Sequence, residues 1–230
     1  MWDCQVPSRP LSLRVREAGG NLLWFRPGTT DLKVLWDTFH HKYHLPPVRL
    51  KPDCVIVDLG ANVGYTVAHF GFLYPKAHII AVELDRDNIE IAKRNIDFLK
   101  PRCKLIHAAV WPTNGHIVYG GNEEWGFHVL EQPADVRSDV KKAPARTLDT
   151  IFEKCHIKTV DYLKMDIEGA EANVLQGSME WIRHVQSMKI ELHPQFNPEA
   201  NLENCFDALL SFGFKCWKDN DHPQCVVAVR

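Results

Sequence analysis

The chain lacks the basic excess that nucleic-acid-binding proteins usually carry, because 27 lysines and arginines are outnumbered by 29 aspartates and glutamates. Binding held mainly by phosphate contacts depends on such an excess, so no nucleic-acid partner is expected. Long apolar runs are also missing: the most apolar stretch, 65–82, contains a proline, a lysine and two histidines. We therefore expect no membrane span.

Cysteine patterns typical of zinc sites and disulfide frameworks are absent as well. The seven cysteines are odd in number and no two are spaced as C-x-x-C, which disfavours both kinds of site. The first ten residues have no basic start followed by an apolar core, so no secretory signal is evident. A reducing, cytoplasmic setting is expected. Cys216 and Cys225 could face each other across a terminal hairpin, but free buried thiols are the preferred interpretation.

The composition that is present is that of an ordinary globular domain, with 45% apolar and 24% charged residues. At roughly 150 residues per domain, the chain fits one large domain with a modest extension. Residues 11–26 alternate apolar and polar positions around Gly-Gly-Asn, which predicts a β-hairpin, and 29–43 predicts a helix. We divide the chain into an N-terminal hairpin and helix, 1–52, expected to act as a lid, and a main domain, 53–230.

The main domain alternates short apolar runs with helix-like segments, which predicts an α/β fold with a mostly parallel sheet. Strands are predicted at 54–59, 78–83, 103–110, 160–167 and 187–193. Helices are predicted at 64–74, 86–99, 147–154, 169–183 and 201–212. Two final apolar runs predict a closing antiparallel hairpin, and 112–145 is an irregular insertion.

A glycine-containing turn, DLGANVG at 58–64, follows the first predicted strand. Ligands of α/β sheets bind at the carboxyl ends of strands, where glycine lets the backbone come close. A dinucleotide fingerprint would need glycine at the positions of Asn62 and Tyr65, so a nicotinamide oxidoreductase is the weaker interpretation. Glu83 ends the second strand and is predicted to accept hydrogen bonds from ribose hydroxyls, whereas Asp58 either binds cofactor or braces the turn.

Four ionisable residues fall in strands that should be buried. Lys164 and Asp166 share one strand face, and Glu191 and His193 share another, because strand side chains repeat every two residues. Unpaired burial would cost several kcal/mol for each group. We therefore expect Lys164 to pair with Glu191 deeper in the sheet, and Asp166 to pair with His193 at its carboxyl rim.

Several motifs carry a resemblance to a known family. They are RPGTTDL at 26–32, DLGANVGYT at 58–66, AVELD at 81–85, HAAV at 107–110, YLKMDIEGAEANVLQG at 162–177 and IELHP at 190–194. Together they resemble the FkbM family of S-adenosylmethionine-dependent methyltransferases. The resemblance implies the class I methyltransferase, Rossmann-like fold and methyl transfer, most often to a hydroxyl oxygen of a sugar or natural product.

The resemblance also implies a set of cofactor-binding residues. The methionine part of S-adenosylmethionine is expected at Asp58, Gly60, Asn62 and Gly64. The ribose is expected at Glu83, and the adenine near Ala108, Ala109 and Val110. The remaining positions assigned to the cofactor are Tyr65, Leu84 and Asp166.

Methyl transfer to an alcohol needs a base that removes the hydroxyl proton as the new bond forms. His193 or Asp166 is predicted to be that base, with Lys164 and Glu191 completing the catalytic group. In the alternative, a bound Mg²⁺ acidifies the hydroxyl, with Asp166 and Glu168 as tentative oxygen ligands. Glu168 otherwise caps the next helix, and Glu171 is interpreted as compensating that helix's dipole.

The sequence thus predicts an O-methyltransferase acting on a hydroxyl of a saccharide or glycosylated acceptor, as a monomer or homodimer. Methylation of a nitrogen or carboxylate on a small metabolite, or a non-catalytic cofactor-binding module, are the alternatives. The insertion is expected to shape acceptor specificity, with Trp125 and Phe127 either a platform for a sugar ring or simple packing. His40, His41 and His44 are expected to be surface or lid histidines and not a metal cluster.

Overall fold

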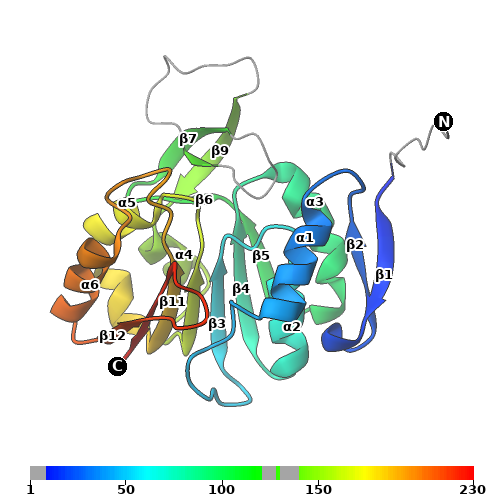
Figure 1. The fold of residues 1–230 in the computed structure, drawn as a ribbon, viewed down its shortest axis with the longest axis horizontal. Coiled ribbons are helices and arrows are strands. Elements are labelled where there is room, and N and C mark those ends of the chain that lie inside the picture. The colour runs from blue at the N-terminus through cyan, green and yellow to red at the C-terminus, as the bar shows by residue number, and fades with distance from the viewer. Residues whose placement is uncertain (1–8, 121–127, 130–139) are drawn as a thin grey trace.

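The centre of the fold is a seven-stranded sheet with the order β12-β13-β11-β10-β3-β4-β5 (Figure 1). The structure, a computed structural model, describes residues 9–120, 128–129 and 140–230. The strands of the sheet are β3 (Val55–Leu59), β4 (His78–Glu83), β5 (Cys103–His107), β10 (Tyr162–Met165), β11 (Ser187–Glu191), β12 (Lys215–Lys218) and β13 (Cys225–Val229). Strands β11, β10, β3, β4 and β5 run parallel to one another, and β13 is antiparallel to both β11 and β12. The predicted α/β class with a closing antiparallel hairpin is confirmed.

Helices cover both faces of this sheet (Figure 1). They are α2 (Tyr65–Leu73), α3 (Arg86–Asn95), α4 (Leu148–Lys154), α5 (Glu171–Gln176) and α6 (Leu202–Ser211). One buried cluster joins α4, α5 and α6 to strand residues such as Val57 and Leu163, and a second joins α2 to Ile56 and Tyr162. Alternate residues of one strand thus enter different clusters, which explains the continuous apolar runs. None of the helices in the described ranges is long and apolar enough to cross a membrane.

The predicted strand 103–110 is divided between two sheets. Its first part ends at His107, where the Ala108 amide donates to the Glu83 carbonyl (2.9 Å). The chain then turns away, and β6 (Ala109–Val110) pairs in parallel with β9 (Lys141–Arg146). The second sheet has the order β6-β9-β7-β8, with β7 (Gly115–Gly120) and β8 (His128–Val129). The insertion therefore contributes a small sheet of its own.

The predicted helix 169–183 is shorter in the structure. It begins at Glu171 and ends at Gln176, because Gly177 is extended, with φ −79° and ψ −157°. A Cβ at Gly177 would lie 3.0 Å from Pro112, so a side chain there would crowd the start of the insertion. A short 3₁₀ turn, Glu180–His184, takes the place of the remaining predicted helix.

The N-terminal extension shares a core with the main domain. It forms β1 (Leu11–Val15), β2 (Asn21–Phe25), α1 (Asp31–Trp36) and a π-helical turn, Asp37–His41. Leu23 of β2 is fully buried in a cluster with Tyr65 of α2 and Ile91 of α3. The Tyr65 hydroxyl also donates to the Trp24 carbonyl (2.8 Å). The extension is thus packed against α2 and α3 by apolar contacts and hydrogen bonds.

His44 is a buried residue, which excludes the surface alternative of the prediction for it and leaves the lid alternative. The π-helical turn ends at Lys42, which has a left-handed φ of 57°, and the chain turns inward. His44 becomes fully buried, with its Nε2 3.0 Å from Nδ1 of His69 in α2. His40 and His41 are exposed, as predicted.

The cysteines that the structure describes are all free thiols, and the prediction of a buried thiol holds for Cys225 but not for Cys216. The antiparallel register of the final hairpin sets Cys216 opposite Ala228, so the two thiols are not partners across it. Cys225 is buried and Cys216 half-buried.

Candidate functional site

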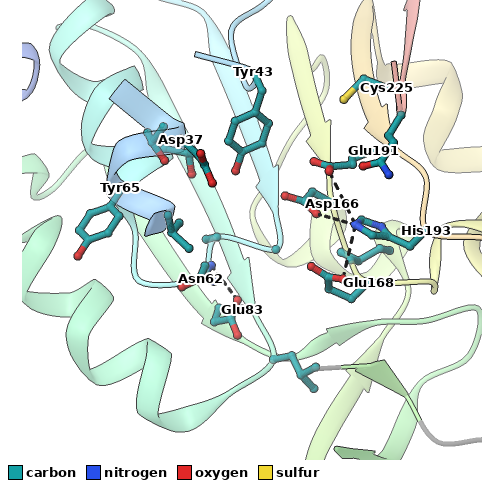
Figure 2. A pocket seen from close by; sticks show the side chains of 18 of the residues that line it. Asp37, Tyr43, Asn62, Tyr65, Glu83, Asp166, Glu168, Glu191, His193 and Cys225 are labelled. Atoms are coloured by element: carbon teal, nitrogen blue, oxygen red, sulfur yellow. Dashed lines mark hydrogen bonds and ion pairs between the residues drawn. The ribbon is translucent and has the colours of Figure 1, made fainter. Parts of the chain in front are cut away.

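A cavity of about 630 Å³ lies at the carboxyl ends of the parallel strands (Figure 2). Its lining includes the turn after β3, the end of β4, the segment that leads into β6, and the residues after β10 and β11. The N-terminal helix and the turn before β13 complete the wall. The cavity is therefore where the sequence predicts ligand binding in an α/β sheet.

Gly60 is required by a close approach of two chain segments. It has a φ of +80°, and a Cβ there would lie 1.8 Å from the carbonyl oxygen of Asp166. Only glycine fits that contact. Gly64 serves packing: a Cβ there would meet Ala92 and Ile96 at 3.1 to 3.3 Å, and Gly64 does not line the cavity.

Asp58 is fully buried and does not line the cavity either. Its carboxylate accepts a hydrogen bond from the Thr66 hydroxyl, and its Oδ1 lies 3.4 Å from Lys164 Nζ. Burial raises the pKa of Asp58, and Lys164 acts in the opposite direction. Of the two interpretations of Asp58, the geometry matches the brace for the glycine turn.

Glu83 lies at the cavity wall with its carboxylate held in place. Oε2 accepts from the Asn62 amide (2.8 Å), and Oε1 accepts from the Asp85 amide (2.8 Å) and from Asn88 Nδ2 (3.3 Å). Burial raises the pKa of Glu83 to about 6. A carboxylate offers about four acceptor positions, so an acceptor position remains on Oε2 for a ligand hydroxyl. The neighbouring wall is apolar and consists of Leu84, Ala108, Ala109 and Val110.

Three carboxylates converge on His193 at the rim of the sheet (Figure 2). The Nε2 atom of His193 lies 3.7 Å from Asp166 Oδ1, 3.5 Å from Glu168 Oε2 and 3.9 Å from Glu191 Oε1. All four residues line the cavity. We call Asp166, Glu168, Glu191 and His193 the rim cluster. Asp166 and His193 are therefore neighbours at the rim of the sheet, as the sequence predicted.

Lys164 does not pair with Glu191 in the way the sequence predicted. Its Nζ lies 3.0 Å from Asp166 Oδ2 and also donates to the Gly60 carbonyl (3.3 Å). The parallel register sets Lys164 beside Lys189, so Glu191 lies two residues nearer the rim. Lys164 is thus a buried link between the rim cluster and the glycine turn.

Glu171 has a role that the sequence did not reveal. It is fully buried; Oε1 accepts from the Ile167 amide (2.9 Å) and lies 3.0 Å from His193 Nδ1, while Oε2 accepts from the Gly169 amide (2.9 Å). Because a carboxylate only accepts, His193 donates from Nδ1 and its Nε2 faces the rim cluster. The dipole interpretation of Glu171 therefore missed its main contact.

Glu168 does not cap the following helix, contrary to that alternative. Its φ is 54°, in the left-handed region, and α5 begins at Glu171 without a side-chain cap. The Glu168 side chain lies beside His193 instead. The sequence did not indicate that Glu171, and not Glu168, accepts the backbone amides before α5. A glutamate in a first helical turn is usually explained by the helix dipole alone.

Glu168, Glu191 and His193 of the rim cluster bind protons more tightly than isolated groups would. Burial and the neighbouring Asp166 charge raise the pKa of both Glu168 and Glu191. Burial acts to lower the pKa of His193, but the hydrogen bond to Glu171 and the nearby carboxylates raise it. These groups titrate as a unit that can accept and release protons beside the cavity.

The predicted magnesium ligands do not form a convincing oxygen site. The side-chain atoms of Asp166, Glu191 and His193 lie within 4.8 Å of one another. That grouping includes an imidazole nitrogen, whereas Mg²⁺ prefers oxygen donors in octahedral geometry. The residues therefore fit Mg²⁺ poorly.

The outer wall of the cavity comes from segments that the sequence did not assign to the site. It is formed by Lys33, Val34, Asp37, Thr38, His41 and Tyr43 of the extension and by Asp221, His222, Pro223, Gln224 and Cys225. Burial raises the pKa of the Cys225 thiol. No described residue of the insertion 112–145 lines the cavity, and Trp125 and Phe127 lie outside the described residues.

Comparison with known proteins identifies the family. The profile of the methyltransferase FkbM domain matches residues 58–216. The chain belongs to the FkbM methyltransferase family. It is 28% identical over 221 residues to the 2-O-methyltransferase NoeI of Sinorhizobium fredii (strain NBRC 101917 / NGR234), covering 88% of this chain and 86% of that protein.

Solved structures agree on the fold. A crystal structure of methyltransferase FkbM from Methylobacillus flagellatus KT matches with a TM-score of 0.57 at 17% identity, covering 84% of this chain and 50% of that one. This chain thus spans about half the length of that protein. The Methanococcus jannaschii fibrillarin pre-rRNA processing protein matches with a TM-score of 0.50 at 13% identity, covering 96% and 81%.

Membership of the FkbM family confirms that the chain is a methyltransferase, and sets aside the non-catalytic module. It implies S-adenosylmethionine as the methyl donor. The cavity suits that cofactor, because Glu83 retains an acceptor position beside an apolar wall. The roles of individual residues follow as proposals.

Proposed function

We propose that this protein transfers the methyl group of S-adenosylmethionine to a hydroxyl of a saccharide or glycosylated acceptor. The observation that carries the proposal is the rim cluster, in which an imidazole and three carboxylates face the cavity. An alcohol is a weak nucleophile unless a base takes its proton, and this cluster supplies one. The 2-O-methyltransferase NoeI, by its name, supports an oxygen acceptor.

In this proposal Glu83 binds the ribose through its remaining acceptor position, and Leu84, Ala108, Ala109 and Val110 enclose the adenine. Gly60 and Asn62 line the cavity together with Glu83 and the rim cluster, and in this proposal they contact the methionine part of the cofactor. Asp58 and Gly64 act from behind the turn by holding its shape. When bound, S-adenosylmethionine supplies an electrophilic methyl group on a sulfonium cation whose charge disappears on transfer.

The rim cluster takes the proton of the acceptor hydroxyl. A cation beside the cluster lowers its pKa values and favours release of protons. Loss of positive charge beside the cluster would raise the proton affinity of His193 and Glu191 as the hydroxyl proton departs. The cluster therefore becomes a stronger base during the step that needs one. Lys164 holds Asp166 in place from beneath (3.0 Å).

The charge of the wall separates the alternative acceptors. Among the described lining residues, Lys33 is the single lysine or arginine, whereas the rim cluster contributes three carboxylates. The rim thus offers a carboxylate acceptor no lysine or arginine partner among the described lining residues. It offers an ammonium several acceptor oxygens, so an amine is the second candidate acceptor.

The experiment begins with calorimetric titration of S-adenosylhomocysteine and NAD against wild type and Glu83→Ala. We expect micromolar binding of S-adenosylhomocysteine alone, weakened at least about tenfold in Glu83→Ala by loss of the ribose contact. Transfer of labelled methyl to oligosaccharides and to matched amines then identifies the acceptor. Absence of S-adenosylhomocysteine binding would contradict the proposed site.

The base is tested with Asp166→Asn and His193→Ala. General-base catalysis contributes about 10²–10⁴ in rate, so we expect turnover of a hydroxyl acceptor to fall about 100-fold or more in each variant, with S-adenosylhomocysteine affinity retained. Asp97→Asn, on an exposed turn away from the cavity, is the control. Undiminished methylation of an amine by both variants would favour the second candidate.

A further inference from the structure

Of the four residues predicted to hold the cofactor's methionine part, only Gly60 and Asn62 line the cavity, and neither carries a charge. The cofactor's amino-acid end carries an ammonium and a carboxylate, and both charges need partners when they leave bulk water. Asp58 and Gly64 do not line the cavity, and Gly60 has no side chain. The partners therefore have to come from another part of the wall.

The N-terminal extension places a pair of opposite charges on that wall. Lys33 and Asp37 both line the cavity, with Lys33 Nζ 3.6 Å from Asp37 Oδ2, one helical turn apart. Lys33 is the single lysine or arginine among the described lining residues, so it is the natural partner for a ligand carboxylate there. The two side chains retain 66% and 31% of their exposure, so their positions are open to a ligand at the cavity mouth.

Thr38 supplies a second and independent observation. The residue is fully buried and lines the same cavity, yet its hydroxyl has no hydrogen-bond partner in the described part of the chain. Buried polar groups are nearly always hydrogen-bonded, and leaving one unpaired is costly. A polar ligand group in the cavity would satisfy this hydroxyl.

The position of this trio matches the order of groups along the cofactor. The apolar wall at Leu84 and Ala108 and the carboxylate of Glu83 take the adenine and ribose ends. Figure 2 shows Asp37 on the side of the cavity where Asn62 and Tyr65 lie, opposite His193. The amino-acid end thus has room near α1 while the rim cluster stays available to the acceptor.

We propose that Lys33 binds the carboxylate of the cofactor's amino-acid end, Asp37 its ammonium, and the Thr38 hydroxyl one of the two. The inference rests on S-adenosylmethionine being the cofactor, as in the proposed function. It gives the extension a direct part in cofactor binding. It also makes cofactor binding depend on charge at two positions of one helix.

Two ligands that differ only at the amino-acid end test this assignment. S-adenosylhomocysteine contains that end, and methylthioadenosine lacks it while keeping the adenosine and sulfur. We expect Lys33→Met, Asp37→Asn and Thr38→Val each to weaken S-adenosylhomocysteine binding about three- to tenfold or more, measured by calorimetry, since each loses about one hydrogen bond or ion pair. Methylthioadenosine binding should change less than about twofold.

Lys93→Met is the matched control, because Lys93 pairs with Glu90 on α3 and does not line the cavity. Equal weakening of both ligands in Lys33→Met and Thr38→Val would overturn the proposal, since the effect would then be on the fold or the adenosine site. Unchanged S-adenosylhomocysteine affinity in Lys33→Met would overturn this assignment and leave the proposed cofactor site intact. Failure of the wild type to bind S-adenosylhomocysteine would overturn the cofactor site together with this assignment.

Discussion

At the scale of single residues, Glu171 sets the orientation of the rim histidine. Its Oε1 lies 3.0 Å from His193 Nδ1 while both of its oxygens accept backbone amides. Glu171 is therefore a positioning residue, which acts on the reaction through His193. The arrangement parallels the buried carboxylates that fix histidine tautomers in other enzymes.

We expect Glu171→Gln to lower turnover about 100-fold or more while changing the KM of either substrate by only a few fold. A glutamine presents one acceptor and one donor, so its NH₂ group either opposes a backbone amide or turns His193 Nδ1 into the acceptor. The ¹⁵N shifts of the His193 ring report which nitrogen carries the proton. Asn173→Ala is the control, because it removes a contact to Asn197 between the same two segments (3.0 Å). Normal turnover in Glu171→Gln would contradict the positioning role.

Residue positions could be predicted from the sequence better than residue partners. Strand alternation placed Asp166 and His193 at one rim, because the two-residue period is local. It failed for Lys164, whose partners depend on the register between β10 and β11 and on the turn after β3. Thr38 and Glu171 were missed because a lone hydroxyl or glutamate gives no pattern until distant segments meet it.

At the scale of elements, a buried histidine pair joins the segment before β3 to α2. Burial lowers the pKa of His69 to about 4, and burial together with the neighbouring His69 lowers the pKa of His44 well below its ordinary value. In the unfolded chain both titrate near 6.5. The unfolded state thus binds more protons between these values, and stability falls as pH drops through that window.

We expect the thermal midpoint of the wild type to fall between pH 7 and pH 5 by more than that of a His44→Leu/His69→Leu double variant. The pair's contribution is fully present above the unfolded pKa and is lost as the pH falls toward the folded pKa of about 4. His40→Gln, at an exposed position, should keep the wild-type slope. Equal slopes in the wild type and the double variant would show that the pair does not couple folding to protons.

Element types were predictable over most of the main domain, but their ends were not. The long apolar run through residue 110 gave no sign that β5 stops at His107 and that Ala109 joins a different sheet. The decisive factor was pairing with β9, more than thirty residues further on. The inward turn of His44 followed from a left-handed residue at Lys42, a conformation that lysine seldom adopts.

At the scale of the whole molecule, the extension is an integral part of the fold. Leu23 and Val15 are buried against Tyr65 and Val63, and the Arg26 guanidinium bridges Asp31 and Asn88. Asn88 in turn donates to Glu83 (3.3 Å). This chain of contacts joins the extension to the proposed ribose site.

We expect removal of residues 1–27 to destabilise the protein by several kcal/mol. Each fully buried apolar side chain contributes about 1.5–3 kcal/mol, against a total of about 5–15 kcal/mol for a typical domain. Urea unfolding of the purified proteins measures the loss, and calorimetry should show weakened S-adenosylhomocysteine binding. A truncated protein with full-length stability would instead support a detachable lid.

Cys225 has a consequence for the protein's own chemical survival. Its thiol lines a cavity that, in the proposed function, holds a powerful alkylating agent through every catalytic cycle. Cysteine reacts with such agents as the thiolate, and burial keeps this sulfur protonated. In the proposed function, the raised pKa thereby disfavours alkylation of the protein's own thiol during turnover.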